Sequence, residues 1–264
     1  MGLNRRDFLR IAGLSALAGL GGKTAFEILA PGELEASEVP LPKGVKWGML
    51  INMHKFDDAL TKKCIEACHK YHNVPNIGNP KEEVKWIWTD SFHHTFPGQE
   101  NEYQSEDIEE MPFLLLCNHC TNPPCVRVCP TKATFKREDG IVAMDMHRCI
   151  GCRYCMAACP YGSRSFNWGD PRLAPEALNP EFPQNPDYPT RSKGVVEKCN
   201  FCAERLAKGE QPACVEAARE ENEEAMIFGD LGDPDSEIRK ALREHYTIRR
   251  KPELGTGPNV FYVI

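Results

Sequence analysis

Eleven of the 13 cysteines in this chain of 264 residues lie in three short runs. The first two runs have the spacings C-x2-C-x4-C-x3-C-P and C-x2-C-x2-C-x3-C-P, and the third has C-x2-C-x11-C. They consist of Cys117, Cys120, Cys125 and Cys129; Cys149, Cys152, Cys155 and Cys159; and Cys199, Cys202 and Cys214. Runs of this kind bind 4Fe-4S clusters, with three thiolates on one cluster and the fourth on its neighbour. The spacing therefore predicts a protein that transfers single electrons.

Exchange of the fourth thiolate between neighbouring runs assigns each cysteine to a site. Site A would consist of Cys117, Cys120, Cys125 and Cys159, and site B of Cys149, Cys152, Cys155 and Cys129. The third run needs one more ligand, and the segment CIEAC at 64–68 looks like the tail of a further run. We expect Cys68 to complete site C with Cys199, Cys202 and Cys214. The sequence thus predicts three 4Fe-4S clusters and no catalytic residue.

A fourth site would need cysteines at 58, 61, 64 and 218 by the same spacing. The chain has Asp58, Thr61, Cys64 and Ala218 at these positions. Three of the four ligands are absent from two segments far apart in sequence, which indicates that one site was lost as a unit. Cys64 is left over, and we expect it to be a small buried thiol.

Structural zinc is the main competing explanation of the C-x2-C pairs, because zinc binds closed tetrahedral sets of four cysteines or histidines. Zinc does not explain three cysteines within C-x2-C-x2-C, or the proline that follows Cys129 and Cys159. A disulfide framework is open to an exported protein, but it fits the spacing no better.

The first 36 residues have the features of a twin-arginine export signal. Arg5 and Arg6 precede an apolar stretch at 11–22 that is rich in Gly and Ala. Clusters are assembled inside the cell, so a loaded protein has to be exported folded, which this route allows. Lys23 and Glu27 interrupt the apolar stretch, leaving it shorter than the roughly 20 residues that span a bilayer. We expect cleavage near Ala36 and a periplasmic or extracytoplasmic protein.

Composition sets further bounds on the chain. Its length suggests one or two domains. The formal net charge is −6, with 38 acidic and 32 basic side chains, so nucleic-acid binding is not indicated.

We expect the cysteines to lie on loops between short strands and helices. The patterns predict strands at 45–52, 84–89, 112–116, 225–231 and 260–263, and helices at 64–72 and from Asp233-Pro234 to 245. Segments 134–136 and 141–145 flank an Asp139-Gly140 turn, which predicts a hairpin between two cysteine runs.

The predicted fold class is α+β, with two interlocked bacterial-ferredoxin-like modules made of short strands, short helices and long loops. The outer module, 45–110 with 193–264, would hold one cluster after losing a second. The central module, 111–169, would hold two. Residues 170–192 contain six prolines and form either a linker or a surface arm that lies on a partner subunit.

Several motifs make the resemblance to a known family specific. They are FKREDGIV at 135–142, CIGCRYCM at 149–156, FGDL at 228–231, LGT at 254–256 and PNV at 258–260. With the interlocked runs, they resemble the iron-sulfur subunits of the dimethyl-sulfoxide reductase superfamily, from about residue 45 to the end. Members usually hold four cubanes in a row between a membrane quinone subunit and a molybdenum subunit. The missing site corresponds to the one nearest the molybdenum subunit.

Within that superfamily the chain is similar to the DsrO type, exported iron-sulfur subunits of a membrane complex linked to dissimilatory sulfite reduction. The resemblance implies three kinds of partner: an NrfD-type quinone-reactive membrane subunit, a multihaem cytochrome c and other iron-sulfur subunits. The chain would be membrane-associated through these partners. It would be an electron-transfer subunit without substrate chemistry of its own. The alternatives are a subunit of an exported molybdenum-type reductase of the tetrathionate or polysulfide kind, and a catalytic cluster with an open iron position.

Charged residues next to the cysteines could tune the cluster potentials by Coulomb attraction. The candidates are Arg127, Arg148, Arg153 and Lys198. His119 and His147 are expected at the surface, and His69 and His72 could support site C.

Overall fold

The computed structural model describes residues 44–171, 184–188 and 191–264. This part of the chain has a mixed α+β fold of short helices and small sheets. The expected export signal at 1–36 lies outside the described residues, as do positions 172–183 and 189–190 of the proline-rich segment. No helix of the described residues is both long enough and apolar enough to cross a membrane.

A four-stranded sheet joins the two ends of the described chain. Strand β1 (Trp47–Asn52) pairs antiparallel with β8 (Met226–Asp230) and parallel with β10 (Val260–Val263), which pairs with β9 (Thr247–Ile248). Successive side chains of a strand point to opposite faces. Met49 and Ile51 therefore enter the main core, whereas Leu50 packs on the other face. The sheet is covered on both sides, which explains why β1 is apolar almost throughout.

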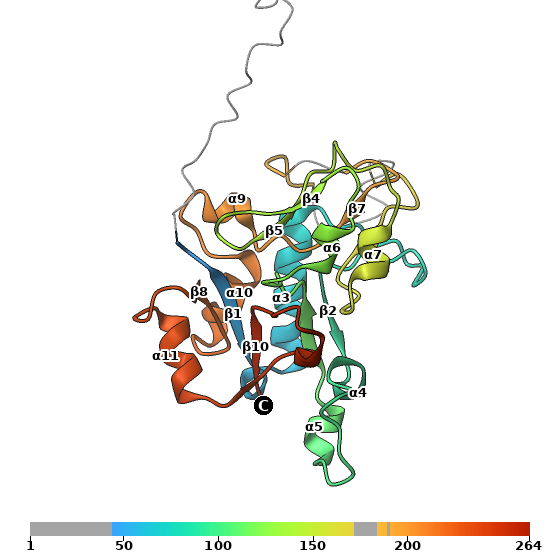
Figure 1. The fold of residues 1–264 in the computed structure, drawn as a ribbon. Coiled ribbons are helices and arrows are strands. Elements are labelled where there is room, and N and C mark those ends of the chain that lie inside the picture. The colour runs from blue at the N-terminus through green and yellow to red at the C-terminus, as the bar shows by residue number, and fades with distance from the viewer. Residues whose placement is uncertain (1–43, 172–183, 189–190) are drawn as a thin grey trace, which may run out of the picture. The chain divides into compact units, whose positions relative to one another are not determined.

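Helix α3 (Asp58–His72) covers one face of this sheet and α11 (Glu237–Glu244) the other (Figure 1). The side chain of Asp57 accepts a hydrogen bond from the Leu60 amide and caps α3, which ends at Asn73 in the left-handed conformation. The buried face of α3 carries Leu60, Thr61, Cys64, Cys68 and His72, most of them spaced by three or four residues. This face packs against α10 (Ala213–Glu221).

Small elements carry the cysteine runs. Strands β2 (Ile87–Asp90) and β3 (Phe113–Leu116) pair, as do β4 (Thr134–Lys136) with β5 (Val142–Met144), and β6 (Ser165–Phe166) with β7 (Val196–Glu197). The short helices are α6 (Pro124–Arg127), α7 (Tyr154–Ala158) and α9 (Ala203–Leu206). Gly140 has φ +84° in the β4–β5 turn, a conformation that glycine adopts without strain.

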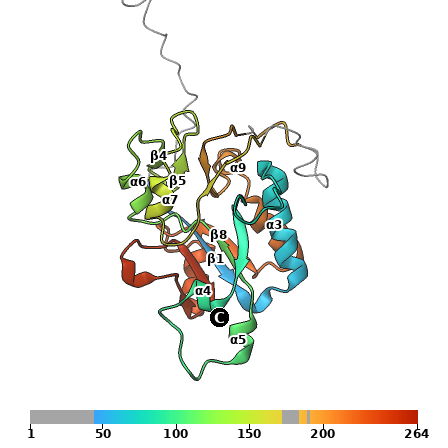
Figure 2. The same cartoon turned by 90° about the vertical axis from the view of Figure 1, so that its right-hand side faces the viewer.

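The remaining elements carry none of the cysteines. Helices α4 (Phe92–Thr95) and α5 (Glu106–Glu110) connect β2 with β3. Two 3-10 turns, η1 (Met53–Lys55) and η2 (Pro252–Leu254), follow β1 and precede β10. In both views α6, α7 and the β4–β5 hairpin lie together at one end, and α4 and α5 lie at the other (Figures 1 and 2).

Most predicted elements are confirmed. The strands expected at 45–52, 112–116, 225–231 and 260–263, and the hairpin between 134 and 145, are all present. The last helix begins later than predicted, because the side chain of Ser236 accepts from the Arg239 amide and caps α11 two residues beyond Pro234. The strand expected at 84–89 is present as β2, which starts at Ile87, and the helix expected at 64–72 is present as the longer α3. Strands β6, β7 and β9, of two residues each, and helices α4, α5, α6, α7, α9 and α10 were not predicted.

Candidate metal centres

One cavity is lined by the four cysteines of predicted site A. Cys117 follows β3, Cys120 and Cys125 flank the start of α6, and Cys159 ends α7. Burial, together with the nearby Cys117 thiol, raises the pKa of Cys120 to about 12. Metal binding has to displace the proton of such a thiol. The cysteines come from both runs, so the chain crosses over between them as the spacing requires.

A second cavity is lined by the four cysteines of predicted site B. Cys149, Cys152 and Cys155 lie before and within the first turn of α7, and Cys129 reaches the cavity from the end of α6. Burial would raise the pKa of Cys129, but hydrogen bonds from Thr134 and Thr131 outweigh it and lower the pKa. The Thr134 amide nitrogen lies 3.4 Å from the Cys129 sulfur. Amide hydrogen bonds to sulfur are one of the means by which proteins set cluster potentials.

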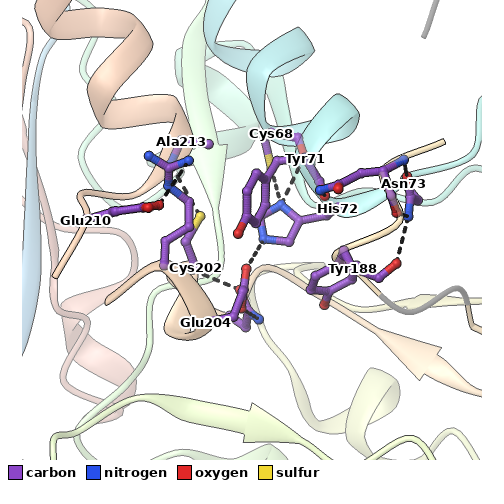
Figure 3. Close-up of polar contacts among 12 residues, drawn as sticks. Cys68, Tyr71, His72, Asn73, Tyr188, Cys202, Glu204, Glu210 and Ala213 are labelled. Carbon is purple, nitrogen blue, oxygen red and sulfur yellow. Dashed lines mark hydrogen bonds and ion pairs between the residues drawn. The ribbon is translucent and has the colours of Figure 1, made fainter. Parts of the chain in front are cut away.

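The four cysteines of predicted site C are the most deeply buried set. Cys68, Cys199, Cys202 and Cys214 are 4 to 8% exposed. Cys68 interacts electrostatically with each of the other three, so the four thiols gather at one place. The Ala213 amide donates to the Cys202 sulfur at 3.4 Å. Figure 3 shows Cys68 on α3 above the rings of Tyr71 and His72, and Cys202, in the turn before α9, to the left of them.

The three sets follow one another in the order C, A, B. Cys199 of site C interacts with Cys117 of site A. Cys125 of site A interacts with Cys155 of site B. Site A is therefore adjacent to both other sets, and we call this arrangement a row with site A in the middle.

Two buried cations flank site A without a carboxylate partner among the described residues. Arg164 is 5% exposed, lines the site A cavity, and interacts with Cys125, Cys155 and Cys117. Its Nη2 atom is buried without a hydrogen-bond partner, and Nη1 donates to the Thr134 hydroxyl at 3.1 Å. Lys198 is 2% exposed and donates to the carbonyl of Cys199 at 2.7 Å and to that of Val142.

These cations test whether the sites fit iron-sulfur clusters. A buried charge costs several kcal/mol unless an opposite charge compensates it. Four thiolates around an iron-sulfur core carry net negative charge and would compensate Arg164 and Lys198. The donor set of four thiols and the surrounding charge therefore both fit 4Fe-4S clusters.

A polar network holds the end of α3 beside site C. The Nδ1 atom of His72 lies 3.7 Å from the Cys68 sulfur and 2.9 Å from the Cys68 carbonyl oxygen, and Nε2 lies 2.7 Å from Glu204. Ligating atoms of His72, Cys202 and Glu204 lie within 4.8 Å of one another. Burial raises the pKa of Glu204, but the hydrogen bond to His72 outweighs it and lowers that pKa. His72 and Glu204 thus line site C (Figure 3).

A buried ion pair supports this network. Glu197 is fully buried and accepts from Trp86 at 2.6 Å, from Asn167 at 2.6 Å and from Arg191 Nε at 2.7 Å. Arg191 also donates to the carbonyl of His72. Arg191 therefore holds the C-terminal end of the proline-rich segment in the core. Its charge is compensated there by Glu197.

The other polar residues considered in the sequence analysis differ in position. Arg127 and Arg148 are exposed, and Arg153 packs its guanidinium 4.8 Å from the Trp168 ring centre. The expectation for His119 was wrong. His119 is fully buried, stacks on Phe201 with ring centres 3.7 Å apart, and accepts from the Val142 amide. These contacts come from segments far along the chain, so spacing does not reveal them.

His147 is exposed, as expected, whereas His69 is half-buried. Burial lowers the pKa of His69 to about 4.

Arg164 is a residue near the sites that was not predicted from the sequence. It follows Cys159 by five residues, and the signal that could have found it is the short Gly162-containing turn that brings the chain back to the cavity.

The positions that the spacing assigned to a lost fourth site lie where α3 and α10 pack together. Thr61, Cys64 and Ala218 are 6% exposed or less. The Cys64 sulfur contacts the Cys214 carbonyl at 3.5 Å, and Asp58 is exposed in the first turn of α3. A continuous helix thus occupies the segment that would have carried three ligands, and Cys64 is the buried thiol that the sequence predicted.

Comparison with known proteins gives one family match. A family model described as a 4Fe-4S dicluster domain matches residues 110–174. This range contains the eight cysteines of sites A and B.

Similar proteins cover much more of the chain. It is 39% identical over 283 residues to the Hdr-like menaquinol oxidoreductase iron-sulfur subunit 1 of Archaeoglobus fulgidus, a match that covers 98% of this chain and 97% of that protein. It is 35% identical over 238 residues to the iron-sulfur cluster-binding subunit of menaquinone reductase from Nitratidesulfovibrio vulgaris, covering 83% of this chain and 89% of the relative. A tetrathionate reductase subunit from Salmonella typhimurium is 42% identical over 170 residues, or 62% of this chain and 58% of the relative.

Proposed function

Because the chain belongs to the family of 4Fe-4S iron-sulfur subunits of respiratory oxidoreductase complexes, we propose that it transfers electrons through three 4Fe-4S clusters. The observation that carries this proposal is the gathering of twelve cysteines into three sets of four, arranged in a row. A site for substrate is not part of the proposal, and the chain acts as a relay between other subunits.

In this proposal each set of thiols binds one cluster. Cys117, Cys120, Cys125 and Cys159 hold the first; Cys149, Cys152, Cys155 and Cys129 the second; Cys199, Cys202, Cys214 and Cys68 the third. A bound 4Fe-4S cluster accepts and releases one electron at a time, at a potential set by burial, charge and hydrogen bonds to sulfur. The protein supplies a dry environment, fixed amide donors and the two buried cations.

Arg164 and Lys198 have a specific task in the row. Each lies against the thiols of site A or its neighbours, and each lacks a carboxylate partner among the described residues. A buried cation favours an additional negative charge nearby, so both residues raise the potentials of the adjacent sites. In this proposal the two cations keep the reduction potential of site A, in the middle of the row, from being too low for an electron to pass through it.

The fold is proposed to consist of two interlocked modules. Pairing of β1 with β8 and β10 brings 45–52 together with 226–263, which supports an outer module made from both ends of the chain. The central module at 111–169 would hold sites A and B. Residues 170–192 would form an arm that lies on the surface of a partner subunit. Arg191 would attach this arm to the core of the chain.

The proposed physiological setting is a quinone-coupled complex linked to sulfite or sulfate reduction. Two relatives are named for menaquinol or menaquinone, which supports the quinone link. The proposed partners are an NrfD-type membrane subunit, a multihaem cytochrome c and further iron-sulfur subunits. Export by the twin-arginine route, guided by Arg5 and Arg6, would place the chain at the extracytoplasmic face of the membrane.

The second candidate is the iron-sulfur subunit of an exported molybdenum-type reductase. The likeness to a tetrathionate reductase subunit favours it. Against it stands the end of the row beyond site C, where α3 and α10 are packed without the ligands of a fourth cluster. Tunnelling falls steeply with distance, so a molybdenum centre beyond that end would be poorly connected.

Purification of the native complex through an affinity tag on this chain distinguishes the two. We expect a quinone-reactive membrane subunit and cytochrome c, with reduction of the clusters by a quinol analogue. Stoichiometric molybdenum in the complex would favour the second candidate. Replacement of Arg5 and Arg6 by lysine should leave a cluster-loaded precursor in the cytoplasm, and normal export of that variant would contradict the proposed route.

A further inference from the structure

A groove at the edge of the four-stranded sheet is lined by basic and uncharged residues alone. Its volume is about 430 Å³, and its cations are Lys46, Arg239, Arg243 and Arg249. None of the described residues that line it is an Asp or a Glu. Leu231, Leu242 and Phe261 add apolar surface. The chain as a whole carries a net charge of −6, so this concentration of positive charge is local.

The four cations make no ion pair with any carboxylate of the described residues. The neighbouring helices behave differently: Arg219 on α10 pairs with Glu237 at 3.0 Å, and Arg205 pairs with Glu216 at 2.6 Å. Burial, and then the charges of Lys136 and Arg249, lower the pKa of Lys46. Like charges that face one another destabilise a fold, so a groove of this kind indicates a ligand that compensates them.

The arginines of the groove are held in place by the backbone. Arg239 Nη1 donates to the Leu231 carbonyl at 3.2 Å, and Arg249 Nη1 donates to the Pro258 carbonyl at 3.5 Å. Arg249 also packs over Phe261, with 5.6 Å from its guanidinium carbon to the ring centre. An arginine has five N–H donors, so each guanidinium keeps donors for a ligand. Preorganised guanidinium groups favour planar carboxylates, which they bind through two parallel hydrogen bonds.

The groove lies next to the loop that carries Cys120 of site A. Thr121 lines the groove and directly follows Cys120, and its amide donates to the Gly257 carbonyl at 2.7 Å. Asn259, which also lines the groove, donates to the carbonyl of His119 at 2.6 Å. A molecule seated in the groove therefore lies close to the middle of the row of sites.

We propose that this groove binds a carboxylate-rich segment of a partner protein and so seats that partner beside site A. A volume of this size falls in the range of sites that enclose a small ligand or several side chains, and it is far larger than a single inorganic anion needs. The apolar surface of Leu242 and Phe261 suits alternating acidic and apolar residues. Placement of an electron-transfer partner there rests on the proposed function, whereas binding of carboxylates does not.

Fluorescence anisotropy with a labelled peptide of sequence Glu-Leu-Glu-Glu-Leu-Glu tests the proposal on the cluster-loaded chain. We expect saturable binding that weakens as salt rises, because exposed charges are screened. The double variant R243Q/R249Q should bind about tenfold more weakly or worse, since it removes two unpaired cations. The control K208Q/K240Q changes the net charge equally, and Lys240 lies on the same helix outside the groove. It should bind as the unaltered chain does.

Three results would overturn the proposal. They are the absence of binding to the unaltered chain at low salt, equal loss in both double variants, and equal binding of a peptide with Gln in place of Glu. Binding to anionic phospholipid vesicles but not to the peptide would assign the groove to a lipid surface instead. If R243Q/R249Q fails to fold, R249Q alone serves, because Arg249 is exposed. Visible absorption of the same samples reports the clusters, so a failure of the proposed function is detected separately.

Discussion

The two ends of helix α3 face the same neighbour and have opposite environments. Its C-terminal half brings Cys68 to the thiols of site C and His72 to Glu204. Its N-terminal half brings Thr61 and Cys64 against α10, where Ala218 is fully buried. The C-terminal half of α3 contacts thiols and a carboxylate, whereas the N-terminal half packs small side chains closely against α10.

On our proposal that a fourth site was lost here, the difference shows how a cluster site could disappear without disturbing its neighbour. A run of cluster ligands needs a loop, whereas residues 58–72 form one capped helix with an apolar face. Once the helix is continuous, packing of small side chains stabilises the segment that a metal would otherwise have held together. The adjacent site keeps Cys68 because its position on the helix still brings it close to Cys214.

The largest expected effect comes from replacing Cys68, in the C-terminal half of α3, by serine, and the matched control is the same replacement of Cys64. Cys68→Ser should abolish the cluster at site C and reduce the iron content by about a third, because one cluster in three loses a ligand. Cys64→Ser, four residues away, should leave the iron content unchanged. Iron and acid-labile sulfide analysis of both variants measures this. Equal iron loss from the two would show that the two ends do not differ as described.

Arg191→Met should be the most destabilising change that leaves every cysteine in place. It leaves Glu197 buried without its cation, and breaking one side of a buried ion pair typically costs about 3–5 kcal/mol. Denaturant unfolding of anaerobic samples, followed by circular dichroism, measures the change. Arg148→Met is the control, since Arg148 is exposed and pairs with Asp145 at the surface. A similar loss in both variants would contradict the role assigned to the buried network at the C-terminal end of α3.

Arg164→Met should change the reduction potentials of sites A and B more than that of site C, which contains Cys68 of α3. Removal of a buried cation should lower the potentials of sites A and B by on the order of 50–100 mV, which corresponds to about 1–2 kcal/mol of Coulomb energy. Site C should change least, because Arg164 interacts with cysteines of A and B. Redox titration monitored by electron paramagnetic resonance gives the potentials. Unchanged potentials at A and B, with all clusters present, would rule out Arg164 as a tuning residue.

The smallest expected effect is a change in the free energy of unfolding on substitution of Thr61, in the N-terminal half of α3. Thr61 is buried and its hydroxyl has no hydrogen-bond partner among the described residues. Thr61→Val keeps the shape and removes an unsatisfied polar group, so it should stabilise the protein by about 1 kcal/mol. Denaturant unfolding measures this too. A loss of stability would show that this hydroxyl is satisfied and that the N-terminal half of α3 is less apolar than proposed.

The sequence predicted the elements and the thiol sets in different ways. Strands such as β1 and β10 could be found because both faces of their sheet are covered, which gives short apolar runs. The assignment of Cys129 and Cys159 to opposite cavities followed from spacing alone, since the short helices between the cysteines allow few paths. The start of α11 was misplaced because proline and serine both favour the start of a helix, and Ser236 supplies the cap.

The surroundings of the sites could not be predicted in the same way. Arg164, Lys198 and His119 are buried by contacts between segments that are 20 residues or more apart, such as that of His119 with Val142. No local pattern marks Lys198 or His119 as buried, and the turn at Gly162 is the one local signal for Arg164. Charged residues next to a ligand differ in exposure, since Arg127 and Arg148 are exposed whereas Lys198 is buried. Tertiary contacts decide which of these charges reach the thiols.

The most direct test of the central claim is the metal content of anaerobically prepared protein. Three complete sets of four cysteines predict about twelve irons and twelve acid-labile sulfides per chain, as three cubes of four. Electron paramagnetic resonance of the reduced protein should show three interacting clusters. Sixteen irons would mean that the packed end of α3 also binds a cluster, eight would remove site C, and zinc in place of iron would contradict the account altogether.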